Sequence, residues 1–170
     1  GMIHSLTRFR LRGLLWYQGE NNAREGAAGA VEYADLLTRL ITSWRAAWTQ
    51  PDLPFLFVQL PNFAEPRDPT GVSWAWFREA QTRVLATPHP GMAVTIDVGE
   101  PDQIHPRNKQ AVGHRLARLA LRLGRAEQAE AHLVRVAGLK PDSRQAYLAA
   151  LFLADVYERQ GRIADAIAAY

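Results

Sequence analysis

A carboxylate and an imidazole lie three residues apart in the segment Asp102-Gln103-Ile104-His105-Pro106. At this spacing, the aspartate can turn back onto the imidazole, hold one tautomer, and stabilise the imidazolium that forms when the histidine takes a proton from a nucleophile. The following proline favours an extended backbone at His105, which predicts a loop position before a helix. The spacing alone leaves a second interpretation open, in which Asp102 caps a helix and His105 is a surface loop residue.

A second polar cluster follows an apolar run, in the segment Trp16-Tyr17-Gln18-Gly19-Glu20-Asn21-Asn22. An oxyanion hole needs donors aimed at developing negative charge, and the Gln18 amide or the backbone N–H groups could supply them. An ionised Glu20 only accepts hydrogen bonds, so it would orient its neighbours or contact substrate hydroxyls. The alternative is an ordinary turn rich in asparagine and glycine.

Three apolar runs predict the strands that position these clusters: Leu14–Tyr17, Pro54–Leu60 and Met92–Val98. They are continuous rather than alternating, which favours parallel strands covered on both faces. Polar residues follow each run, at Gln18–Asn22, Gln59–Asn62 and Glu100–His105. In parallel sheets, ligands bind beyond the carboxyl ends of the strands, so the sequence predicts one shared site there.

Helices are predicted between these strands. The first has an apolar stripe at three- and four-residue steps, with Pro51 and Pro54 after it: Tyr33, Leu36, Leu37, Leu40, Ile41, Trp44 and Trp48. The second carries Trp76, Ala80, Val84 and Leu85 and stops before Pro88 and Pro90. The alternation of strand and helix indicates βαβ units, and hence an α/β fold with a parallel sheet.

The remainder of the chain, residues 113–170, is predicted to be all-α. Gly124 and Gly161 each begin a similar segment, with a small alanine five residues later and Leu133 or Tyr170 nine residues later. This pattern resembles a tetratricopeptide repeat, although the two glycines are 37 residues apart instead of the usual ~34. The alternative is a pair of ordinary amphipathic helices. The predicted division is therefore 1–112 and 113–170, with one helix shared at the join.

Several blocks of residues 2–122 together resemble the sialate O-acetylesterase-like carbohydrate esterases. Arg12 to Ala23 is similar to their "RGVxWYQGExNA" block, and Arg78-Glu79-Ala80-Gln81 matches their "REAQ" helix. Leu53 to Phe55 with Val58 to Phe63 resembles their next strand. Met92 to Gly99, followed by Ile104 to Lys109, resembles their "TIDxG…IHPxNK" block. The blocks occur in order and at sensible spacing, which makes the combination specific.

The resemblance implies a three-layer α/β/α SGNH-hydrolase fold and a serine esterase that removes O-acetyl groups from sugars without a cofactor or metal. On that pattern, His105 is the general base and Asp102 orients it. Gln18 and Gly19 would lie near the oxyanion, with Glu20 and Asn21 beside them. This chain departs from the pattern at Gln103, where family members often carry an acid, and that leaves the Asp102 assignment less secure than His105.

The family's nucleophilic serine stands in a Gly-Gln-Ser-Asn segment, and none of the serines here has those neighbours: Ser5, Ser43, Ser73 and Ser143. A histidine and an aspartate cannot run acyl transfer without a nucleophile. We therefore expect a fragment with about three strands of the sheet, inactive alone. The competing hypothesis is a protein-interaction module, in which the repeat binds a protein partner and the esterase part is a scaffold.

Composition excludes several classes of function. There is no cysteine, so disulfides and thiol catalysis are excluded. The five histidines show no metal-ligand spacing, and we expect His114 and His132 on helix surfaces. The net charge of +3 comes with no nucleic-acid motif, and no apolar run reaches the ~20 residues that a membrane span needs. The first residues lack a signal-peptide layout and resemble the interior of a longer protein, so no compartment is predicted.

Overall fold

The computed structural model describes residues 3–122, 133–134 and 144–169. The chain divides into two compact units, Gly1–Val112 and Gly113–Tyr170, which are treated separately below.

The first unit is built on a parallel sheet of three strands, in the order β1 (Leu14–Trp16), β2 (Phe55–Val58) and β3 (Pro90–Ala93). Both pairings are parallel, and Trp16 aligns with Phe57, which aligns with Met92. This confirms the predicted parallel α/β arrangement, because the segments that join β1 to β2 and β2 to β3 both contain helix.

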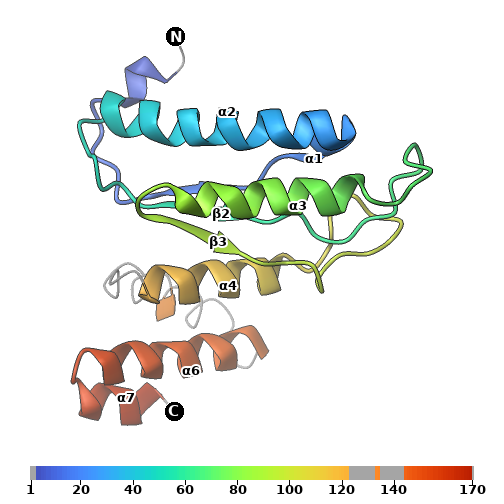
Figure 1. The fold of residues 1–170 in the computed structure, drawn as a ribbon. Helices are drawn as coiled ribbons and strands as arrows, with labels where there is room; N and C mark the ends of the chain where they lie inside the picture. Colours follow the sequence, from blue (N-terminus) through green and yellow to red (C-terminus); the bar gives the residue numbers. More distant parts are fainter. Residues whose placement is uncertain (1–2, 123–132, 135–143, 170) are drawn as a thin grey trace. The chain divides into compact units, whose positions relative to one another are not determined.

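The helices of this unit are α1 (Glu20–Ala23), α2 (Gly26–Ala47) and α3 (Ser73–Arg83), with short 3-10 turns η1 (His4–Leu6) and η2 (Val84–Ala86). Helices α2 and α3 lie side by side against the sheet (Figure 1). Their buried residues form one core with the strands, including Ile41, Phe55, Phe57 and Phe77, each 0–1% exposed. At about 25 cal/mol per Å² of buried apolar surface, this core is the main source of the unit's stability.

The third strand lies earlier in the sequence than predicted. It covers Pro90–Ala93 instead of Met92–Val98. Proline is tolerated there because the first residue of a strand need not donate to the ladder. Beyond Ala93 the chain leaves the sheet, since the Thr95 hydroxyl donates to the Gln59 carbonyl and Val98 N–H closes a turn on the Thr95 carbonyl.

Helix α2 ends at Ala47, before Pro51, because Thr49 adopts a left-handed conformation (φ 53°) and stops the helix.

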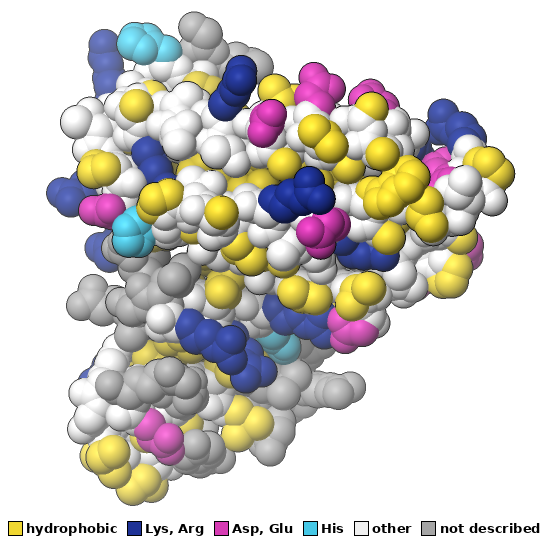
Figure 2. All heavy atoms as spheres, in the orientation of Figure 1, with side chains coloured by type: hydrophobic (Ala, Val, Ile, Leu, Met, Phe, Trp, Pro, Cys, Tyr) yellow, Lys and Arg dark blue, Asp and Glu magenta, His cyan; other side chains and the backbone are white. Residues whose placement is uncertain are grey.

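The predicted apolar faces also need correction. Leu36 and Trp76 are each 47% exposed, whereas Trp74 and Phe77 supply the buried face of α3. Leu15 is 67% exposed, so β1 is not covered on both faces. Figure 2 shows scattered apolar side chains between charged ones over α2 and α3.

The second unit holds most of α4 (Lys109–Arg122), together with α6 (Arg144–Arg159) and α7 (Ile163–Ala169). Helices α6 and α7 pack together, and an apolar cluster is formed by Leu121, Leu133, Leu153 and Val156. The first of the two repeat-like segments, around Gly124, lies outside the described residues, so the tetratricopeptide repeat stays a prediction. Among the residues that the structure describes, no helix has both the length and the hydropathy that a membrane span requires.

His114 lies in α4 and packs against an aromatic residue of α6. Its ring lies 5.3 Å from that of Phe152, between ring centroids, and the residue is only partly exposed. Burial lowers the pKa of His114, because desolvation penalises the imidazolium. His132 lies outside the described residues.

Candidate active site

The polar segments that follow the three strands meet at one edge of the sheet. Because β1, β2 and β3 run parallel in register, their carboxyl ends point the same way. Residues 17–22, 59–65 and 94–105 therefore leave the sheet at the same edge, as the sequence predicted.

Two aromatic side chains hold the segment after β1. The Tyr33 hydroxyl of α2 donates to the Gln18 carbonyl at 3.0 Å and accepts from the Trp16 indole N–H at 3.2 Å. The next residue, Gly19, has φ 146° and lies against the Phe77 ring of α3. The Gln18 amide turns toward Asn22 and donates to its side-chain oxygen at 3.1 Å. The conformation of this segment is thus set by α2 and α3.

Glu20 and His105 come together, although 85 residues separate them. Glu20 Oε1 lies 3.6 Å from His105 Nε2, and Glu20 Oε2 accepts from the Gly19 N–H at 3.0 Å. The glutamate side chain is 18% exposed and the imidazole 73% exposed. One carboxylate therefore links the segment after β1 with the loop between β3 and α4, residues 94–108, which is called the histidine loop below. The same carboxylate accepts from the Gly19 N–H that was predicted to lie near the oxyanion.

Asp102 is exposed, and within the described part of the chain the acidic side chain in contact with His105 is that of Glu20. The turn that contains Asp102 is closed by Gln103 N–H donating to the Glu100 carbonyl at 3.1 Å. Glu100 Oε1 also accepts from the Arg107 N–H at 3.1 Å, which fixes the chain on the other side of the histidine. Of the serines, Ser43 donates its hydroxyl to the Leu40 carbonyl at 3.0 Å, within α2.

The start of α4 holds the far end of the histidine loop. The Asn108 side chain accepts from the Ala111 N–H at 3.1 Å, as an N-cap does. Lys109 Nζ lies 4.8 Å from the centre of the Tyr17 ring, a cation–π contact back to the first segment. Burial, with the charge of Glu20 adding to it, raises the pKa of Tyr17 to about 12, so the phenol stays neutral.

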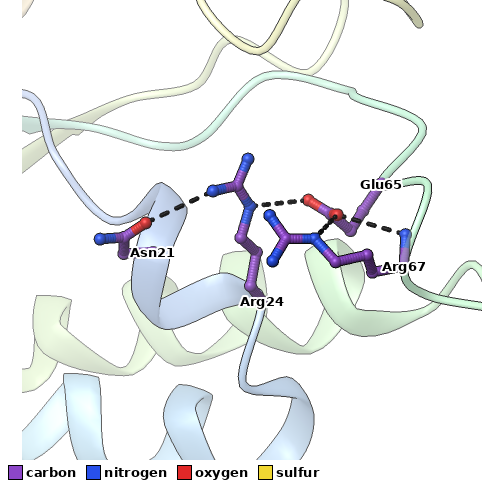
Figure 3. Close-up of polar contacts among 4 residues, drawn as sticks. All are labelled: Asn21, Arg24, Glu65 and Arg67. Atoms are coloured by element: carbon purple, nitrogen blue, oxygen red, sulfur yellow. Dashed lines mark hydrogen bonds and ion pairs between the residues drawn. The ribbon is translucent and has the colours of Figure 1, made fainter.

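Figure 3 shows a polar cluster that the sequence analysis did not identify. The Glu65 side chain, 3% exposed, accepts from Arg24 Nε at 2.9 Å and lies 3.5 Å from Arg67 Nε. Arg24 also reaches the Asn21 side-chain oxygen at 3.5 Å. These residues come from the end of α1 and from the loop after β2, and no spacing rule in the sequence connects them.

Residues 2–122 match the family described as carbohydrate esterase, sialic acid-specific acetylesterase. This match covers the first unit, including every candidate site residue. The chain belongs to that family. Membership in the acetylesterase family confirms the resemblance that the motifs around Gln18 and His105 indicated.

Individual relatives agree with the family match. The chain is 34% identical to the sialate O-acetylesterase of Rattus norvegicus and 31% identical to that of Homo sapiens, over 131 residues in each case. A solved carbohydrate acetylesterase from Xanthomonas citri is 48% identical, with a TM-score of 0.65, over 70% of this chain and 27% of that one. The aligned part is 68% of this chain but only 24% of the rat or human acetylesterase, so the chain spans about a quarter of these relatives.

Proposed function

We propose that this chain supplies the histidine-bearing part of a site that removes O-acetyl groups from sugars. The observation that carries the proposal is the 3.6 Å contact between His105 and Glu20, within a segment that belongs to a carbohydrate esterase family. The contact joins the two segments that were predicted independently as catalytic, one after β1 and one after β3.

In the proposed mechanism, His105 Nε2 is the general base that takes the proton of a serine hydroxyl as its oxygen attacks the acetyl carbon. The imidazolium then returns that proton to the departing sugar oxygen, and water releases acetate from the serine. In such a triad the orienting carboxylate holds Nδ1, while Nε2 faces the nucleophile. Glu20 lies on the Nε2 side, which is the side that faces the nucleophile. We therefore assign the role of the orienting carboxylate at Nδ1 to Asp102.

Two donors could stabilise the oxyanion, and both are engaged by neighbouring side chains. The Gln18 amide donates to Asn22, and the Gly19 N–H donates to Glu20. We propose that substrate entry frees these donors, because Glu20 then turns toward substrate hydroxyls. Asn21 lies beside Glu20 in this proposed site. Once freed, the two donors would stabilise the negative charge that develops on the acetyl oxygen, which is how an oxyanion hole lowers a barrier.

The nucleophile is the part that this chain does not provide in the family's sequence context. No serine here lies between Gly-Gln and Asn. We therefore propose that the chain by itself does not turn over acetyl esters, and that the complete reaction needs a serine in that context. No cofactor enters this scheme, and no group of three histidine, cysteine or acidic residues suited to a metal occurs within the described residues.

Sugar binding can be tested without turnover. Backbone and imidazole NMR signals would be followed while O-acetylated N-acetylneuraminic acid or an O-acetylated xylo-oligosaccharide is added, with each deacetylated sugar as the control. We expect the signals of Gln18–Asn22 and His105 to move with an acetylated sugar and to move less with its deacetylated form. His89, which is exposed and pairs with Asp52 at 3.4 Å, is the internal control. Equal changes at His89 and His105, or none with any acetylated sugar, would contradict the assignment.

A further inference from the structure

The proposed reaction does not use the buried Glu65 carboxylate. It lies in the loop after β2, is held by Arg24 and Arg67, and is not expected to touch substrate, because its side chain is only 3% exposed (Figure 3). A buried carboxylate that lost these partners would be strongly destabilising, so the three residues act as one unit.

The charge state of this cluster is defined by its contacts. Burial alone would favour protonation of Glu65, but the hydrogen bonds from the Arg24 side chain and the Arg67 N–H, with the charges of both arginines, outweigh it. The pKa of Glu65 is therefore below its usual value, and the carboxylate is ionised at neutral pH.

The position of Glu65 in the chain matters as much as its charge. The preceding residue, Ala64, donates its N–H to the Pro101 carbonyl at 3.0 Å, in the loop that leads to His105. Three residues before Glu65, Asn62 lies against Gly99, where a side chain would meet the Asn62 carbonyl oxygen. The loop after β2 is thus joined to the histidine loop by its backbone.

Glu65 joins the same loop to the other half of the site. Its partner Arg24 ends α1, and Arg24 is four residues after Glu20, so the two side chains lie on one side of that helical turn. The adjacent residues Ala64 and Glu65 therefore reach both segments that bring Glu20 and His105 together, one through a backbone hydrogen bond and one through an ion pair.

We propose that Glu65 is a positioning residue for this esterase site: through Arg24 it holds the Glu20 segment at the distance from the His105 loop that the catalytic arrangement requires. The inference rests on the proposed function, in which Glu20 and His105 belong to one site. Glu65 acts through Arg24, because its own side chain pairs with Arg24 and Arg67 and not with Glu20 or His105.

The test uses the histidine as its reporter. Imidazole NMR signals of the isotope-labelled chain would be recorded, with His105 assigned through His105→Ala. Glu20→Gln defines the change that follows loss of the carboxylate beside Nε2. We expect Glu65→Gln to move the His105 signals in the same direction, by at least half as much. Arg24→Gln should do the same, and it is the second variant if Glu65→Gln does not fold.

Two controls separate positioning from general destabilisation. Glu79→Gln removes a different ion pair, the exposed contact with Arg83 at 3.6 Å. Ile41→Val weakens the fully buried core without touching the cluster. Both should leave the His105 signals unchanged.

The outcomes distinguish this inference from the proposed function. If Glu20→Gln moves the His105 signals and the folded Glu65→Gln and Arg24→Gln proteins do not, the positioning role is wrong and the pairing survives. If Glu20→Gln itself has no effect, the pairing is wrong and the positioning role falls with it. A change in Ile41→Val as large as that in Glu65→Gln would also overturn the inference, because loss of stability would explain both.

Discussion

Replacing Gly19 by alanine is expected to destabilise the first unit by about 3 kcal/mol, the sum of a steric clash and backbone strain. A Cβ at this position would lie 2.5 Å from two ring carbons of Phe77, far inside the 3.5–4.0 Å at which carbon atoms are in contact. The backbone φ of 146° is also one that side chains rarely adopt. Denaturant unfolding followed by tryptophan fluorescence measures the effect, because all five tryptophans lie in the first unit.

A double-mutant cycle with Phe77→Leu identifies the cause. Leucine removes the ring atoms that the new methyl group would meet, so Gly19→Ala should cost at least about 1 kcal/mol less in that background. Equal costs in the two backgrounds would mean that backbone strain, not the ring, makes glycine necessary. A cost below about 1 kcal/mol in the parent chain would contradict both explanations. Because Gly19 directly precedes Glu20, the same substitution should move the carboxylate away from His105.

Replacing Arg45 by glutamine is expected to cost a similar amount, about 3 kcal/mol, because it leaves the buried Leu53 carbonyl and two partly buried carbonyls without their donor. Arg45 is 6% exposed, and its guanidinium donates to the carbonyls of Leu53, Pro88 and His89 at 3.0, 2.6 and 3.1 Å. Burial lowers the pKa of Arg45, although the nearby Asp52 charge opposes the shift, and an arginine stays charged. One side chain thus ties α2 to the turns before β2 and β3.

Arg39→Gln is the matched control for this effect, since Arg39 is an exposed residue of the same helix. It should change the free energy of unfolding by no more than about 0.5 kcal/mol. If the two substitutions had similar effects in the same fluorescence experiment, the three hydrogen bonds would not be the reason that Arg45 is buried.

The fold was predictable wherever the pattern of apolar residues follows the burial of the side chains. Phe55 to Val58 are all buried, and a continuous apolar run indicates that directly. The prediction was wrong where single contacts override the pattern. The apolar residues from Val94 to Val98 predicted a strand. Instead, the Thr95 hydroxyl donates to the Gln59 carbonyl, and the chain turns away from the sheet. Trp76 is hydrophobic enough for the core, yet Trp74 and Phe77 occupy the side of α3 that faces it.

The candidate site was predictable in its segments but not in its contacts. Parallel strand order places the residues after β1 and after β3 at one edge, so the proximity of Glu20 and His105 follows from topology. Which carboxylate lies beside the imidazole depends on side-chain geometry, and spacing pointed to Asp102 instead of Glu20. Glu65 was missed for the same reason, because its partner Arg24 is 41 residues away in the sequence.

We propose that this chain carries the histidine of an acetylesterase site but not its nucleophile. The most direct test is hydrolysis of para-nitrophenyl acetate by the purified chain and by His105→Ala, with both shown to be folded by circular dichroism. We predict equal rates for the two proteins, with no saturable turnover. Saturable turnover that depends on His105 would contradict this proposal, because it would require a nucleophile within this chain.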